Sequence, residues 1–142
     1  MTPIQHQNQD ADAPGRQIRR PDRPWGEKFS DAFRGLQQGI RGESSFFAHF
    51  FITAAVILAA IVLDVNLLEW CLLIICITVV LVAEMVNTAL ESLARAITDE
   101  PNPHVGGALD IGSAAVLLAS MGASAVGVVV LLEALAKLLG WL

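Results

Sequence analysis

The sequence predicts an all-α membrane protein in which an N-terminal amphipathic surface helix precedes three transmembrane helices. Hydrophobic residues make up 54% of the 142-residue chain, and its mean hydropathy of +0.57 is too high for an ordinary soluble domain. Three long apolar runs are each close to, or longer than, the roughly 20 residues that cross a bilayer. A chain of this length has room for one such domain, which we expect over residues 25–142.

The N-terminal part of the chain divides into a polar tail and an amphipathic segment. Residues 1–24 contain Pro, Gln, Asp and Arg without apolar periodicity, and this composition predicts a disordered cytoplasmic tail. Residues 25–41 predict a helix lying at the membrane surface, and a helix packed on another protein is the alternative. Its apolar residues recur at helical spacing between charged ones: Trp25, Phe29, Ala32, Phe33, Leu36 and Ile40.

Three transmembrane spans are predicted at about 46–63, 67–97 and 111–139. The second is longer than a bilayer is thick, so its last turns should emerge from the membrane. The third is rich in Gly, Ala and Ser, which let helix backbones approach closely in lipid. Between these two spans, the prolines and glycines of Thr98–Leu109 predict a loop.

The charge distribution predicts the orientation of the chain in the membrane. The formal net charge is −5, yet seven of the nine Lys and Arg residues precede the first apolar run, whereas Asp64 and Glu69 mark the next junction. By the positive-inside rule the N-terminus is cytoplasmic, as is the loop before the third span. The basic segment is not accompanied by a nucleic-acid-binding module in which aromatic residues alternate with basic ones. It is therefore interpreted as a signal for topology and lipid headgroups rather than as a nucleic-acid site.

Two classes of site are excluded by the motifs of the chain. Cys71 and Cys76 lie five residues apart in an apolar run without His or Cys partners at metal-ligand spacing, so they are interpreted as packing residues rather than as a disulfide or zinc site. The sequence contains neither GxxxxGK[ST] nor a kinase GxGxxG, which excludes a standard nucleotide-binding fold.

An acidic cluster in the second span is the candidate for chemistry. Glu84, Asn87 and Glu91 are spaced by three and four residues, which places them on one helix face. Charged groups at bilayer depth cost several kcal/mol, so they are expected to face protein, water, a cation or a substrate. Alternatively, these three side chains only stabilise the packing of the helices through interhelical hydrogen bonds.

Depth assigns roles to the members of this cluster. Glu84 is the deeper glutamate, and apolar surroundings make a carboxylate a better general base. Glu91 and Glu43 suit Mg²⁺, which takes one or two carboxylates together with nucleotide phosphates, and Asn87 is placed to orient a hydroxyl or a phosphate. His49, alone on an apolar face, is interpreted as a packing residue rather than a ligand. His104 is either an exposed loop residue or a nucleotide contact.

The segment Glu84-Met-Val-Asn87-Thr88-Ala89-Leu90-Glu91 resembles the E-x-x-N-[ST]-A-[IL]-E signature of the prokaryotic diacylglycerol kinase family, which also contains the undecaprenol kinases. The resemblance runs from about Phe29 to the C-terminus. Three further segments are similar to the family's surface helix, to the beginning of its first span and to the start of its last span: Phe29-x-x-Ala32-x-x-Gly35-Leu36, Glu43-Ser-Ser-Phe46-Phe-Ala-His49 and Asp110-Ile-Gly112-Ser113-Ala114-Ala115-Val116-Leu117.

This resemblance implies a homotrimer of three-span subunits in the bacterial inner membrane, with active sites shared between subunits. It implies phosphoryl transfer from ATP, with Mg²⁺, to the primary hydroxyl of a membrane lipid. Diacylglycerol is the expected acceptor and undecaprenol the alternative. Another class of function, a non-catalytic membrane subunit or a proton-conducting helix bundle, also fits an acidic pair in a span. Three spans are few for burying carboxylates, which independently favours an oligomer.

The resemblance also implies roles for individual residues. It makes Glu84 the general base, Glu43 and Glu91 metal and ATP contacts, Asn87 a contact to substrate or phosphate, and Asp110 an ATP contact.

Two departures from the family pattern affect the expected activity. The family usually has Lys directly before the aspartate, where this chain has Leu109, and the segment 104–110 is about two residues short. Loss of an ammonium near the triphosphate removes charge stabilisation on which phosphoryl transfer depends. Arg95 or a basic residue of the surface helix is a candidate substitute.

Overall fold

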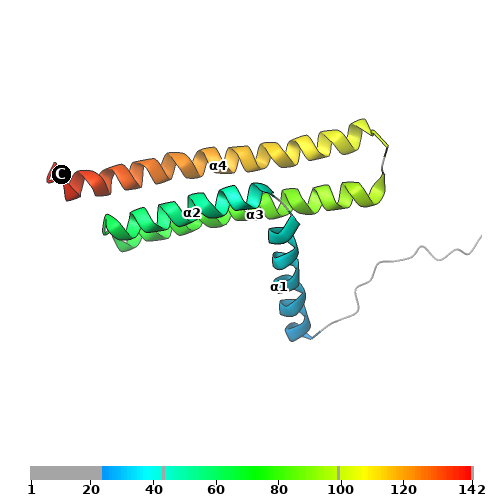
Figure 1. Ribbon diagram of the computed structural model, residues 1–142, viewed down its shortest axis with the longest axis horizontal. Helices are drawn as coiled ribbons and strands as arrows, with labels where there is room; N and C mark the ends of the chain where they lie inside the picture. Colours follow the sequence, from blue (N-terminus) through cyan, green and yellow to red (C-terminus); the bar gives the residue numbers. More distant parts are fainter. Residues whose placement is uncertain (1–23, 43, 99, 142) are drawn as a thin grey trace, which may run out of the picture.

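The computed structural model describes residues 24–42, 44–98 and 100–141 and is built of four helices (Figure 1). The expected N-terminal tail lies outside these residues, apart from Pro24. No strand occurs in the described part, so the prediction of an all-helical fold is confirmed. The helices are α1 (Trp25–Gly42), α2 (Ser44–Val62), α3 (Leu67–Ile97) and α4 (Pro103–Leu138).

Three of the helices lie alongside one another, and α1 crosses them steeply (Figure 1). α1 meets the bundle at the start of α2, and α3 and α4 continue past this level, which we call the α1 end (Figure 1). The end formed by the α2–α3 turn is called the turn end. A buried cluster of apolar side chains at the turn end joins α2, α3 and α4: Ala60, Val65, Leu73, Val130 and Ala134. Its position means that α2 is fixed most firmly at the turn end.

The α2–α3 turn is closed by a capping box at the start of α3. The Asn66 side chain accepts hydrogen bonds from the backbone N–H groups of Leu68 and Glu69, and the Glu69 carboxylate accepts one from the Asn66 backbone at 2.7 Å. Such reciprocal bonds satisfy the first N–H groups of a helix. Lys137 Nζ, near the end of α4, donates to Glu69 Oε1 at 3.2 Å and so ties the two long helices together at the turn end.

The loop predicted over Thr98–Leu109 is wrong from Pro103 onward, because α4 begins there. The Asn102 side chain accepts hydrogen bonds from the backbone N–H groups of His104 and Val105, and Pro103 occupies the first turn. Both residue types favour a helix start at these positions. Glycine within a helix costs only about 1 kcal/mol relative to alanine, so this strong start outweighs Gly106 and Gly107.

Two helices, α3 and α4, are long and apolar enough to cross a membrane. Their outward surfaces are largely apolar, with exposed Ile, Leu and Val side chains along most of their lengths. The apolar part of α2, Phe46–Val62, is shorter than these two helices. At 1.5 Å per residue the 31 residues of α3 extend about 46 Å, well beyond a hydrocarbon layer of roughly 30 Å.

Candidate functional site

The acidic cluster lies on α3 near the α1 end, and its outer part forms a row of polar contacts. Asn87 Nδ2 donates to Glu91 Oε1 at 2.9 Å, and Glu91 Oε2 lies 4.0 Å from Arg95 Nη1. The spacing of four residues makes these side chains neighbours on one helix face. This row carries both an anionic and a cationic group at the edge of the bundle.

Glu84 is set apart from this row by its burial. Only 4% of the residue is exposed, and His49 on α2 is the group beside its carboxylate, with Nε2 3.8 Å from Oε2. The two side chains are 19% and 5% exposed, respectively. A buried charge is expensive unless it is paired, so this contact between helices explains how α3 accommodates a carboxylate here.

Asn87 presents an unsatisfied acceptor inside the site. Its Oδ1 is buried and has no hydrogen-bond partner among the described residues, although buried amide oxygens are normally paired. Close approach of α4 covers it at Gly112, where an added Cβ would lie only 2.6 Å from Oδ1. The glycine therefore allows α4 to pack directly over Asn87, and the Oδ1 atom lies buried and unpaired beneath it.

The position along α3 separates the two glutamates by environment. With Leu67 at one face of a hydrocarbon layer of roughly 30 Å, Glu84 lies 17 residues further, about 26 Å along the axis, and just inside the opposite face. Glu91 lies about 36 Å along, beyond that layer. In this placement Glu84 lies at the boundary of the apolar layer, while Glu91 lies in the aqueous region.

The remaining predicted site residues are not gathered around the glutamates in the described part of the chain. Asp110 and His104 are exposed on α4, and neither makes a side-chain hydrogen bond to the α3 glutamates there. The side chain of Glu43 lies outside the described residues. Among the residues that are described, no three His, Cys, Asp or Glu side chains come together as a metal site.

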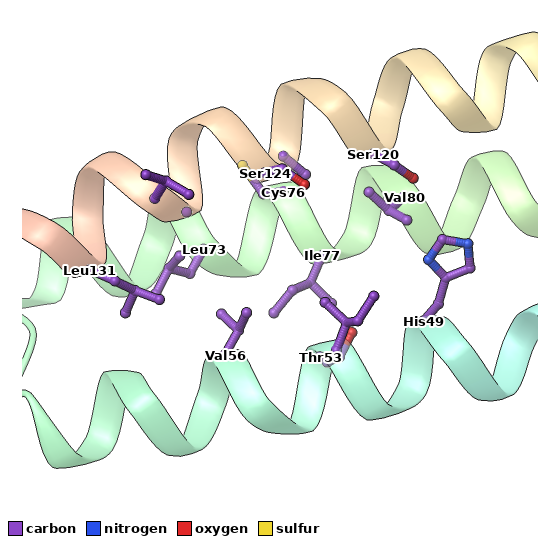
Figure 2. Close-up of a pocket in the computed structure, with 14 residues that line it drawn as sticks. His49, Thr53, Val56, Leu73, Cys76, Ile77, Val80, Ser120, Ser124 and Leu131 are labelled. Carbon is purple, nitrogen blue, oxygen red and sulfur yellow. The ribbon is translucent and has the colours of Figure 1, made fainter.

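A cavity of about 270 Å³ runs between α2, α3 and α4 toward the turn end (Figure 2). His49 lies at one end of it, next to Val80 and Ser120, and Leu73 and Leu131 lie at the other. Most of the lining is apolar, and a mostly apolar pocket with a few polar groups is typical of a site for a small hydrophobic ligand. Glu84 is not among the lining residues, and His49 connects this cavity with the carboxylate by contacting both.

Three features of this site were not predicted from the sequence. His49 and Glu84 are 35 residues apart, so no local spacing indicates their contact. The close approach at Gly112 also depends on packing between helices. Ser120 Oγ is buried without a hydrogen-bond partner in the described part of the chain. The sequence does not distinguish this serine from the other serines of the same Ala- and Gly-rich span. The sequence feature that His49 and Glu84 have in common is that the predicted topology places both near the same membrane face.

Comparison with protein families matches residues 30–131 to prokaryotic diacylglycerol kinase. The matched segment begins within α1 and ends in α4, and it includes His49, Glu84, Asn87, Glu91 and Gly112. A search of curated proteins found no significant match.

Proposed function

The chain belongs to the prokaryotic diacylglycerol kinase family, and we propose that it transfers the γ-phosphoryl group of ATP to the primary hydroxyl of diacylglycerol, giving phosphatidic acid. Family membership makes it a lipid kinase of the diacylglycerol or undecaprenol kinase type. The observation that carries the proposal is the buried carboxylate of Glu84, which lies one helical turn from the unpartnered Oδ1 of Asn87. Undecaprenol is the alternative acceptor.

The proposed reaction uses Glu84 as the general base. The lipid hydroxyl donates its one hydrogen bond to Glu84, and the Asn87 Nδ2 hydrogen that is not bonded to Glu91 donates to the hydroxyl oxygen and aligns it. As the lipid oxygen forms its bond to the γ-phosphorus, the bond between that phosphorus and the bridging oxygen breaks, ADP leaves, and the hydroxyl proton passes to Glu84. A positioned general base contributes about 10²- to 10⁴-fold to the rate of such a step.

The residues near the edge of the bundle suit Mg²⁺ and ATP. Glu91 is partly exposed, with 29% of its side chain accessible, and its carboxylate can serve as one of the one or two that Mg²⁺ takes beside phosphate oxygens. We assign Glu43 as the second. When bound, Mg²⁺ neutralises charge on the β- and γ-phosphates. Arg95, next to Glu91, supplies positive charge where Leu109 replaces the family's lysine, and Asp110 and His104 remain candidate ATP contacts.

The proposed topology has three spans, with the N-terminus and the site on the cytoplasmic face of a bacterial inner membrane. The 19 residues of α2 extend about 28 Å, close to the hydrocarbon thickness of roughly 30 Å. The orientation follows from the basic residues that precede α2.

A homotrimer is the proposed assembly. Only four residues of the 36-residue α4 are buried in the described part of one chain, whereas its small residues, such as Ala114 and Ala115, are exposed. Small residues favour close packing between membrane helices. A neighbouring subunit could also complete the metal site. Native mass spectrometry from detergent should detect three chains per particle, and a particle of one chain would contradict this assembly.

The function is tested by ATP-dependent phosphorylation in mixed micelles with Mg²⁺, with diacylglycerol and undecaprenol assayed in parallel. We expect label on diacylglycerol, none with Glu84→Gln, and ATP binding retained by that variant. Leu109→Lys should raise turnover by restoring an ammonium near the triphosphate. Label on undecaprenol alone would select the alternative acceptor.

Label on neither lipid, with either the native chain or Leu109→Lys, would contradict the kinase proposal. Proton flux into liposomes without ATP, lost in Glu84→Gln, would instead support the proton-conducting bundle.

A further inference from the structure

We propose that His49 is a positioning residue for Glu84, holding the carboxylate of the general base from the neighbouring helix. The inference rests on the proposed function. Its basis is the distance of 3.8 Å between His49 Nε2 and Glu84 Oε2, in a place where both side chains are largely excluded from solvent. The contact uses one carboxylate oxygen and leaves Oε1 for the acceptor hydroxyl.

The surroundings of His49 show why the contact matters for placement. Its imidazole projects from α2 toward α3 and α4 at the end of the cavity (Figure 2). At the turn end, Ala60 of α2 is fully buried in the core cluster. The cavity separates that cluster from the α1 end, so the pair of His49 and Glu84 joins α2 to α3 across a poorly packed interval and fixes the position of the base.

The first test compares variants at position 49 in the lipid phosphorylation assay. His49→Leu should lower kcat at least tenfold and leave KM for Mg·ATP within twofold, because the base is misplaced while the nucleotide site is intact. His49→Gln keeps an N–H donor but no charge, so it should recover part of kcat. The matched control is Phe50→Leu, the next residue of α2, which is 64% exposed and should behave as the native chain. Native kcat in His49→Leu would overturn the proposal.

The second test does not require turnover and therefore separates this inference from the kinase proposal. Hydrophobic carbodiimides modify carboxyl groups that they can reach, so the extent of labelling at Glu84, measured by mass spectrometry at one fixed pH, reports how closely its carboxylate is held. Removal of the imidazole in His49→Leu frees the carboxylate and should increase labelling severalfold, with Phe50→Leu unchanged. Equal labelling in all three proteins would overturn the proposal even if the native chain phosphorylates lipid. Increased labelling in His49→Leu, with no lipid phosphorylated by the native chain, would support the contact between His49 and Glu84 and contradict the kinase proposal.

Discussion

Replacing Gly112 by alanine tests whether the close approach of α4 to Asn87 shapes the site. The added Cβ would lie 2.6 Å from Asn87 Oδ1 and 3.1 Å from Leu90 Cδ1. Ordinary contact begins at 3.4 Å, so the Asn87 oxygen must move by about 0.8 Å or α4 must move away. Either shift disturbs the hydrogen bond of 2.9 Å from Asn87 to Glu91.

Two opposing terms determine the effect of Gly112→Ala on stability. Overpacking costs about 1–3 kcal/mol, and replacing glycine by alanine in a helix returns about 1 kcal/mol. The net destabilisation should therefore be at most about 2 kcal/mol. Activity should respond more strongly, because a misplacement of 1 Å in a site can cost about 100-fold, and we expect a loss of about 10- to 100-fold in kcat.

The matched control is Gly122→Ala, which lies on the same helix with nothing within 4 Å of the added Cβ. It should gain stability and keep its activity. Lipid phosphorylation and thermal unfolding in detergent, measured on both variants, decide the outcome. If Gly112→Ala kept the kcat of Gly122→Ala, the close approach of α4 would have no part in forming the site.

Other changes probe separate parts of the molecule. Glu91→Ala should raise KM for Mg·ATP and raise the Mg²⁺ concentration that gives half-maximal activity. An unchanged Mg²⁺ dependence would show that Glu91 is not a metal ligand. Asn66→Ala deletes the helix cap and should lower the free energy of unfolding by about 1 kcal/mol. Its kcat should not change, because Asn66 lies about 27 Å along α3 from Glu84. A loss of kcat in this variant would show that the two ends of α3 are coupled. Gly39→Ala should cost less than twofold in activity, because the flexible Met85 side chain that meets the added Cβ at 2.7 Å can move, whereas Gly39→Leu should displace α1 and increase its digestion by protease. Equal digestion of both Gly39 variants would contradict a role for this contact in docking α1.

The helical segments follow from the sequence because local signals mark most of their ends. Apolar periodicity begins at Trp25, where α1 starts, and α3 starts at Leu67, as expected for the second predicted span. The position of α4 does not follow as directly, since the prolines and glycines of residues 98–109 together predict a loop, whereas Asn102 and Pro103 begin the helix. A capping asparagine followed by proline is a local helix start that outweighs two glycines when a long apolar helix follows.

The candidate site was predictable only where it lies on a single helix. Spacing alone places Glu84, Asn87 and Glu91 on one face of α3, and their contact at Asn87 and Glu91 agrees with that spacing. The partner of Glu84 could not be predicted, because α2 brings His49 to it through packing between helices. The same reason applies to Gly112, whose importance depends on which helix faces it.

The crossing of α1 over the bundle affects how the protein responds to membrane thickness. Its large apolar side chains, from Trp25 to Ile40, are 40–74% exposed, and with this face in the headgroup region α1 follows one leaflet. Gly39 lies against the side chain of Met85, the residue next to Glu84. The depth of the Glu84 carboxylate is therefore set relative to the leaflet on which α1 lies. A thicker or thinner bilayer would change the burial of the turn end, near Asp64 and Lys137, while Glu84 keeps its depth below that leaflet.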